Sequence, residues 1–242
     1  MNSNRMTAVI VGVLFLTATA TTMLGDSLIV STLYDPDYLF SMYPNRTQVI
    51  IGVLIAFIDA LAVIGIAVLL FPILKKQNES IALGYVGIRI AEFPILLVWL
   101  LSPLLLIALS QEYVKASAPD ASSFQTLGAV LIALRLWSWR LIYLINGIAT
   151  LMLAYLLFQS KLVPRWISVL GLIGGAVLLA GTSLAMLGLM DVDQGIGMLA
   201  VLPGALFELI LPIWLIVKGF NSSAIASLSA STDIKELQMS TS

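Results

Sequence analysis

The chain is a succession of long apolar runs separated by short polar breaks. Six runs are long enough to cross the ~30 Å hydrocarbon core of a bilayer, which takes about 20 residues of helix. They cover residues 6–28, 48–74, 81–109, 138–158, 166–190 and 195–217. The runs are continuous rather than alternating, which favours helices over the strands of a membrane barrel. Short connections predict that neighbouring spans pack as antiparallel hairpins.

The first run has a second interpretation as a secretory signal peptide. Arg5 precedes an apolar stretch that contains the small residues 18–20, a pattern typical of a cleavage site. The apolar character continues through Leu24 and resumes at residues 28–30. We therefore expect this segment to be retained as the first span.

The stretch before the fourth span is apolar but contains Arg135 and Arg140. One helix over residues 124–158 would be about 50 Å long, more than a single crossing needs. Its apolar residues recur at three- and four-residue steps, as on one face of a helix. We expect residues 122–136 to form an amphipathic helix on the membrane surface, between spans three and four. The alternative is one tilted helix that protrudes from the membrane.

Composition supports an all-α integral membrane protein. Of 242 residues, 12 are basic and 13 acidic, and 60% are apolar, whereas a soluble domain is about 25% charged. The lack of His and Cys excludes thiolate nucleophiles and ordinary haem or zinc ligation, so no cofactor is expected. A net charge of −1 argues against nucleic-acid binding. We expect one membrane domain over residues 1–221 and a mobile cytoplasmic tail over 222–242.

Basic residues predict the sidedness of the spans, because cytoplasmic loops are enriched in Lys and Arg. With the N-terminus inside, seven basic residues face the cytoplasm and two face outward. The inner ones are Arg5, Lys75, Lys76, Lys161, Arg165, Lys218 and Lys235, and the outer ones are Arg46 and Lys115. This bias predicts a protein of the inner cell membrane with both termini in the cytoplasm.

Several polar side chains lie inside the predicted spans, although a charge at the bilayer centre costs roughly 2.5–3.5 kcal/mol. The candidate residues are Asp59, Arg89, Glu92, Asn146 and Glu208. Counted at 1.5 Å per residue, the three acids lie within about 8 Å of one another in depth. Arg89 and Glu92 are three residues apart, so they share a helix face and can pair. These residues are our candidate substrate- or ion-binding site.

Prolines accompany two of the acids. Pro94 follows Glu92 by two residues, and Pro203 and Pro212 bracket Glu208. A proline removes a backbone hydrogen bond and can bend a helix. Interrupted helices with carboxylates nearby are typical of cation or proton sites in membrane carriers. The pattern therefore favours a carrier for a small solute, proton or cation.

A second interpretation is a non-catalytic structural or regulatory membrane subunit, in which an Arg–Glu pair and two protonated carboxyl groups simply hold helices together. Catalysis is not expected, because no two acids lie close together at a cytoplasmic helix end and no Gly-x-Ser-x-Gly sequence occurs. The sequence indicates neither the oligomeric state nor a protein partner.

The chain contains an ordered set of residues spread over its spans. They are Asp59, Arg89, Ile90, Ala91, Glu92, Phe124, Gln125, Tyr155, Leu156, Leu157, Ser160, Pro164, Arg165, Gly171, Glu208 and residues 214–219. This set resembles a bacterial multi-pass membrane family known as domain-of-unknown-function family 4386. The resemblance extends from about Arg5 to Asn221 and implies six spans and important acid and arginine positions. Many members carry a His before the fourth span, and residues 134–140 of this chain contain none.

Overall fold

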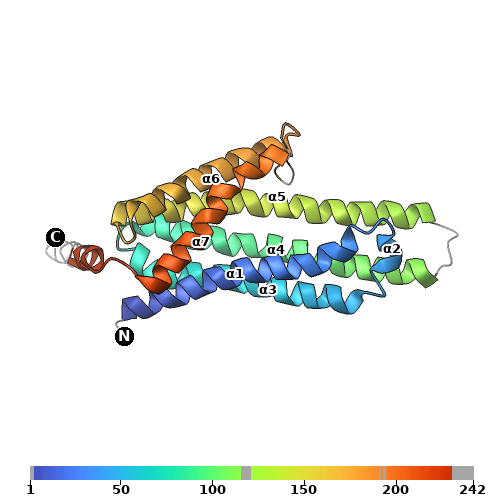
Figure 1. The fold of residues 1–242 in the computed structure, drawn as a ribbon, viewed down its shortest axis with the longest axis horizontal. Coiled ribbons are helices and arrows are strands. Elements are labelled where there is room, and N and C mark those ends of the chain that lie inside the picture. Colours follow the sequence, from blue (N-terminus) through green and yellow to red (C-terminus); the bar gives the residue numbers. More distant parts are fainter. Residues whose placement is uncertain (1–2, 116–120, 191, 193–194, 231–242) are drawn as a thin grey trace. The chain divides into compact units, whose positions relative to one another are not determined.

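A computed structural model describes residues 3–115, 121–190, 192 and 195–230, and these residues contain helices and no strand. Figure 1 shows the elements in chain order. They are α1 (Ser3–Leu33), α2 (Tyr38–Ser41), α3 (Arg46–Leu74), α4 (Glu79–Lys115), α5 (Ala121–Ser160), α6 (Arg165–Met186), the 3₁₀ helix η1 (Gly195–Ala200) and α7 (Leu202–Val217). Residues 222–230 are also helical.

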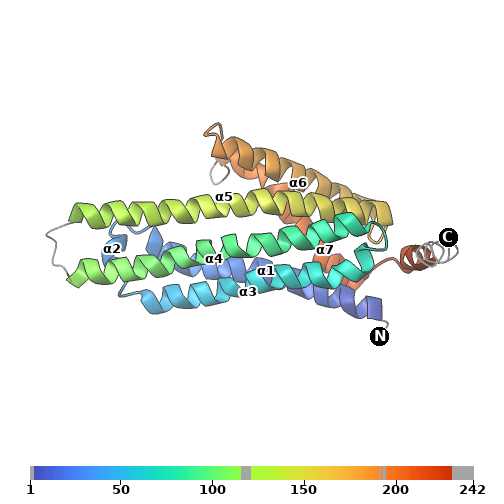
Figure 2. The ribbon, with the colours of Figure 1, turned by 180° about the vertical axis from the view of Figure 1, so that it is seen from behind.

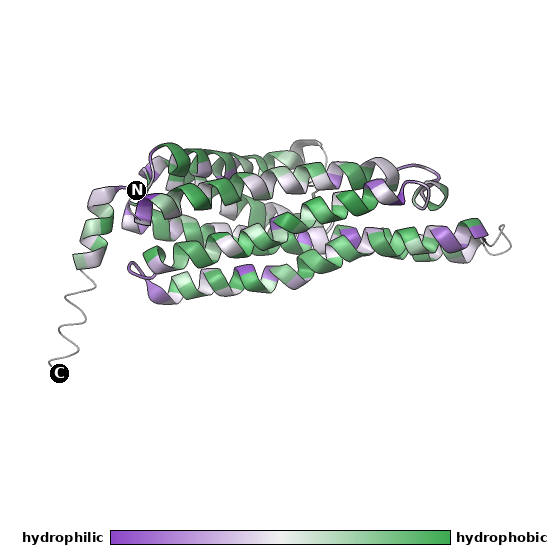
Figure 3. Ribbon diagram, turned by 90° about the horizontal axis from the view of Figure 1, so that it is seen from below, coloured by the Kyte–Doolittle hydropathy of each residue, from purple (hydrophilic) through white to green (hydrophobic). Residues whose placement is uncertain are grey.

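Six helical segments are long and apolar enough to cross a membrane. They are α1, α3, α4, residues 122–160 of α5, α6, and the segment Gly197–Val217, which joins the end of η1 to α7. Figure 3 shows apolar residues along the helices and hydrophilic ones mainly at helix ends and connections. The prediction of six helical spans is confirmed.

The predicted surface helix at residues 122–136 is wrong, because α5 runs without a break from Ala121 to Ser160. Its 40 residues correspond to about 60 Å of helix. No proline interrupts it. Ser138 sits at the expected break, but its Oγ donates 2.8 Å back to the Leu134 carbonyl within the helix. Arg135 is buried and ion-paired rather than facing solvent, so it does not end the apolar helix.

The chain divides into two compact units, and four helices contribute a segment to each. Unit 1 comprises Met1–Leu16, Val63–Ala91 and Tyr143–Ser242. Its core joins Val11 of α1, Leu70 of α3, Tyr85 of α4, Leu153 of α5 and Phe207 of α7. Unit 1 therefore contains all of α6 and α7, together with parts of the four other long helices.

The start of α1 is fixed to the end of α7 within unit 1. Arg5 Nη1 donates 2.9 Å to the Leu215 carbonyl, and Nη2 donates to the carbonyls of Ile216 (2.6 Å) and Val217 (3.2 Å). The last carbonyls of a helix lack partners within that helix. The arginine supplies those partners, and its charge favours the negative end of the α7 dipole.

Unit 2 comprises Thr17–Ala62 and Glu92–Ile142. Here the second part of α4 and the first part of α5 run side by side (Figures 1 and 2), and Ser102 Oγ donates 2.7 Å from α4 to the Leu131 carbonyl of α5. Ser110 of α4 holds α2 in place, since its Oγ donates to the Leu39 carbonyl (2.7 Å) and accepts from the Tyr43 N–H (2.9 Å). Polar bonds thus supplement apolar packing in this unit.

The segment predicted as a tail is described in part. Residues 222–230 are helical, and Ala224 and Leu228 are buried in the core of unit 1. Lys76 Nζ also donates 3.0 Å to Ser229 Oγ. Residues 231–242 lie outside the described residues, and the mobility of the tail stays a prediction.

Helices α6 and α7 approach each other through two glycines. A Cβ atom built on Gly174 would lie 2.7 Å from both Cα and N of Gly204, which is backbone that cannot rotate away. Gly204 is buried in turn. Small residues at such crossings let helix backbones pack closely in membranes.

We expect Gly174→Ala to destabilise the protein by about 1–3 kcal/mol, because the added methyl group overpacks this contact. The matched control is Gly87→Ala in α4, where nothing lies within 4 Å of the added Cβ. That variant should be neutral or stabilising by about 0.5–1 kcal/mol, since alanine favours the helix. Thermal unfolding in detergent measures both, and equal effects would contradict the close crossing.

Candidate functional site

Three of the five predicted site residues form a hydrogen-bonded chain in unit 1. Arg89 Nη2 of α4 donates 3.0 Å to Asn146 Oδ1 of α5. Asn146 Nδ2 donates 3.0 Å to Glu208 Oε1 of α7. Thr150, one turn further along α5, donates 3.3 Å to the same Asn146 oxygen. One amide therefore links a cationic and an acidic side chain that come from different helices.

The cationic end of this chain is the most buried part. Arg89 is 6% exposed, and its guanidinium carbon lies 5.7 Å from the centre of the Tyr85 ring, within the range of a cation–π contact. Asn146 and Glu208 are each half-buried. Burial therefore decreases along the chain, from the guanidinium of Arg89 to the carboxylate of Glu208.

The local sequence of α7 explains how Glu208 comes to lie in this chain. The helix starts with Pro203 in its first turn and contains Pro212 four residues after Glu208. Proline has no N–H, so Pro212 cannot form the usual helical bond to the Glu208 carbonyl. A carboxylate and an interrupted stretch of backbone therefore occur at one position of the span.

The other two predicted residues belong to unit 2. Glu92 is 3% exposed, and it follows Arg89 by three residues along α4. Asp59 lies on α3 and is half-buried. Both side chains make polar interactions. Their convergence with Arg89, Asn146 and Glu208 at one depth stays a prediction.

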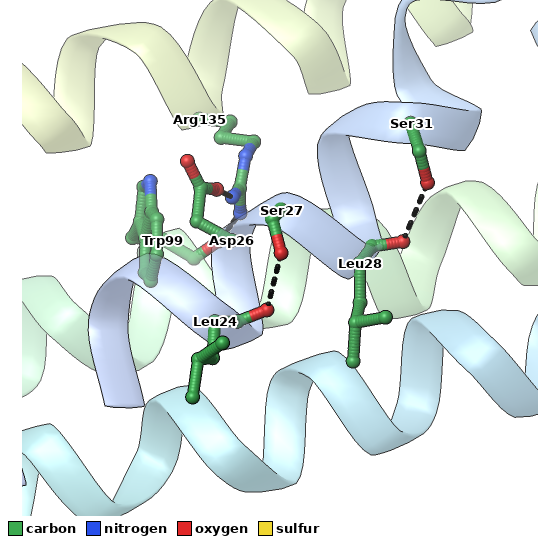
Figure 4. A network of polar contacts seen from close by, with 7 residues as sticks. All are labelled: Leu24, Asp26, Ser27, Leu28, Ser31, Trp99 and Arg135. Carbon is green, nitrogen blue, oxygen red and sulfur yellow. Dashed lines mark hydrogen bonds and ion pairs between the residues drawn. The ribbon is translucent and has the colours of Figure 1, made fainter. Parts of the chain in front are cut away.

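Unit 2 contains a second buried arginine that the sequence analysis did not include in the site. Arg135 of α5 forms an ion pair with Asp26 of α1 and donates 3.1 Å from Nη1 to the Trp99 carbonyl of α4. Figure 4 shows the three side chains together, with Arg135 reaching between the helices. Its guanidinium carbon also lies 4.1 Å from the Trp99 ring centre, and that ring stacks on Trp139 at 5.0 Å. This group joins three helices.

The two charges of the Arg135 group were not connected in the sequence analysis. Asp26 lies at the end of the predicted first span, and Arg135 lies in the stretch expected to form the surface helix. One signal in the sequence could have identified this pair. A long apolar run contains an arginine, and another apolar run contains a single acid. Such isolated opposite charges in apolar segments usually meet.

The described residues contain no group of three or more acids placed to hold a metal ion. Outside the spans, burial raises the pKa of Tyr38 in α2 above its ordinary value, so this phenol stays neutral at physiological pH.

The candidate site in unit 1 consists of the Asn146 amide, the Arg89 guanidinium and the Glu208 carboxylate.

Six apolar helices of this length make the chain a multi-pass membrane protein. A family model described as "Domain of unknown function (DUF4386)" matches residues 10–219, and the chain belongs to this family. The match confirms the resemblance drawn from the sequence, and it covers every candidate site residue. No curated protein and no solved structure matches the chain.

The Arg135–Asp26 pair should behave as a buried, coupled pair. Asp26→Asn leaves a guanidinium that is 7% exposed without its counter-charge, which costs about 3–5 kcal/mol for a fully buried pair and less here because Asp26 is 37% exposed. In a double-mutant cycle with Arg135→Gln, we expect a coupling energy of about 1–3 kcal/mol. Unfolding of the four proteins in detergent measures it.

The control for this cycle is the exposed pair Glu112–Lys115, whose side chains are 63% and 59% exposed. Glu112→Gln and Lys115→Gln should show coupling of about 0–1 kcal/mol. Coupling that is as small for Asp26 and Arg135 would show that their contact contributes little to folding.

Proposed function

We propose that the protein carries a small cationic solute or a proton across the membrane, with Glu208 as the group that binds it. The observation that supports this proposal is the chain Arg89–Asn146–Glu208, which places a carboxylate from α7 at the end of a polar link between three apolar helices. Ionisable groups inside membrane spans commonly mark ion or substrate pathways.

The architecture of the sixth span supports the same role. A 3₁₀ segment, Gly195–Ala200, precedes α7, which is only 16 residues long and contains Pro212. Membrane carriers commonly bind their substrates and coupling ions where a spanning helix is interrupted. The interrupted span is also the one that contributes Glu208.

Each residue then has a separate task. Arg89 provides a positive charge that is linked to Glu208 through the Asn146 amide. A proton or cation on Glu208 weakens its acceptance of the Asn146 N–H, so loading the site loosens the link between α5 and α7. We include Asp59 and Glu92 as further acids of the pathway, on their predicted depth. The role is binding and transport rather than catalysis.

The alternative is a non-catalytic structural or regulatory subunit. The oxygen and the nitrogen of the Asn146 amide both bind protein groups within one unit. Such bonds are expected if the amide only holds the helices together, a role that we call a static lock. A static lock predicts that Glu208 affects stability and leaves transport unchanged.

Proton flux into proteoliposomes that contain a pH-sensitive dye tests the carrier. We expect the wild-type protein to exceed empty liposomes under an imposed gradient, and Glu208→Gln to reduce flux at least about tenfold, equivalent to about 1.4 kcal/mol. The matched control is Glu79→Gln, which removes an exposed acid at the start of α4 and should leave flux unchanged. Parallel assays with sodium and potassium gradients cover the cations.

Two results would contradict the proposal. One is flux no higher than that of empty liposomes for every ion. The other is a Glu208→Gln protein that folds and transports like the wild type. A loss of stability in Glu208→Gln without any flux to lose would favour the structural subunit.

We further propose that the N-terminus, the connections after α3 and α5, and the end of α7 face the cytoplasm of a bacterial cell. The basic residues support this sidedness, as do the bonds from Arg5 to the end of α7 and from the Asn221 N–H to the Leu162 carbonyl (2.9 Å). These bonds bring three of the basic segments to one end of unit 1.

The absence of cysteine from the sequence makes the sidedness simple to test. In intact cells, a membrane-impermeant maleimide should label Thr47→Cys, at the exposed start of α3, and should leave Ser222→Cys unlabelled until the cells are opened. The reverse pattern would invert the orientation without changing the number of spans.

A further inference from the structure

A pocket of about 510 Å³ lies in unit 1 between the α5–α6 connection and the end of α7. Its volume is in the range of small-ligand sites, about 300–1,000 Å³. The lining residues that matter for its chemistry are Lys161, Arg165, Trp214, Lys218, Phe220 and Asn221. The pocket belongs to neither the Arg89–Asn146–Glu208 chain nor the Arg135 group.

The charges around this pocket have one sign. Lys161, Arg165 and Lys218 line it and are exposed, and no carboxylate is among its described lining residues. The guanidinium carbon of Arg165 also lies 5.4 Å from the Phe158 ring centre, and this contact restricts the conformations of the arginine side chain. Three cations around one pocket, without an acid to neutralise them, favour an anionic ligand.

The end of α7 would normally weaken such a positive site, because the last carbonyls of a helix carry partial negative charge. In this protein Arg5 binds the carbonyls of Leu215, Ile216 and Val217. Arg5 also lies close to Gly219, since a Cβ atom there would be 2.9 Å from Nη1. A fourth cation therefore offsets the helix end beside the pocket.

The two turns that form the pocket walls are fixed to each other. The Asn221 N–H donates 2.9 Å to the Leu162 carbonyl. Gly219 has φ +75°, and Lys161 has φ +55°, a left-handed conformation that usually favours glycine at the end of a helix. A lysine at this position keeps a charge at the pocket where glycine would suit the backbone better.

The aromatic and basic side chains that line the pocket together limit the chemical class of its ligand. Trp214 and Phe220 give the pocket an apolar side, and tryptophan is enriched where membrane and water meet. Lysine and arginine are the usual ligands of phosphate. Basic pockets between spanning helices bind the phosphates of anionic lipid head groups.

We propose that this pocket binds a phosphate group, and that the group belongs to an anionic phospholipid of the surrounding leaflet. Lys161, Arg165 and Lys218 hold the phosphate, and Trp214 and Phe220 contact the adjoining glycerol and upper acyl carbons. This proposal requires that the protein lies in a membrane, and it does not depend on the proposed carrier function.

The variant that tests the site is Lys161→Gly together with Lys218→Gln. Glycine suits the left-handed backbone at 161, so this variant removes two charges with little strain. The matched control, Lys75→Gln with Lys76→Gln, removes two charges from the α3–α4 connection in the same unit, outside the pocket. Thermal unfolding in phosphatidylcholine alone checks that both full-length variants fold, and Lys218→Gln alone serves if the double variant does not.

The first measurement is native mass spectrometry of the full chain in detergent with equal amounts of phosphatidylglycerol and phosphatidylcholine. We expect the wild type and the control to retain phosphatidylglycerol preferentially. The pocket variant should retain about 20- to 30-fold less, because each basic residue near an anionic lipid contributes about fivefold to binding. The second measurement is the unfolding temperature in inorganic phosphate against chloride at equal ionic strength.

The outcomes separate the two sources of phosphate. Selective loss of phosphatidylglycerol from the pocket variant supports the lipid site. Stabilisation of the wild type and control by inorganic phosphate, absent from the pocket variant and without lipid selectivity, supports the anion site and overturns the lipid as its source. Equal lipid retention by all three proteins together with equal responses to phosphate overturns the proposal.

Discussion

Hydrocarbon offers no hydrogen-bond partner, so polar side chains at the depth of the hydrocarbon core must find their partners in the protein. This constraint is visible in each unit separately. In unit 2, Ser102 donates to a carbonyl of α5, and Arg135 binds both a carboxylate and a carbonyl. In unit 1, Asn146 joins Arg89 to Glu208. Apolar packing has little preference for one neighbour over another in lipid, and these polar bonds specify which helices lie side by side.

The number of spans could be predicted because it depends on composition alone. A run of about 20 apolar residues has few alternatives to a membrane helix, and the predicted runs agree with the helices except around α5. There, the prediction took one continuous helix to be too long for a single crossing and divided it after residue 136, which placed Arg135 on the membrane surface. Whether an arginine ends an apolar helix depends on a partner elsewhere in the chain, and hydropathy along one segment contains no information about that partner.

The site was predictable to a similar extent. The side chains of Arg89, Asn146 and Glu208 stood out because polar groups are rare within apolar spans. The predicted match in depth concerned the three acids Asp59, Glu92 and Glu208, and it did not indicate that Asn146 joins Arg89 to Glu208. Depth does not give the rotation of each helix about its axis, so the sequence could not identify the bridging amide. Asp26 was missed for a related reason: it lies at the end of a span, where an acid needs no partner, and only the structure gives it one.

The bonds from Arg5 to the end of α7 connect the first residues of the chain with some of the last. During translation Arg5 leaves the ribosome some 210 residues before the carbonyls that it binds, and domains made in this order begin to fold from their N-terminal side. Arg5 can therefore form these bonds only after α7 has been synthesised. This closing contact of unit 1 thus forms late, after the segments that α1, α3, α4 and α5 contribute to the unit have been made.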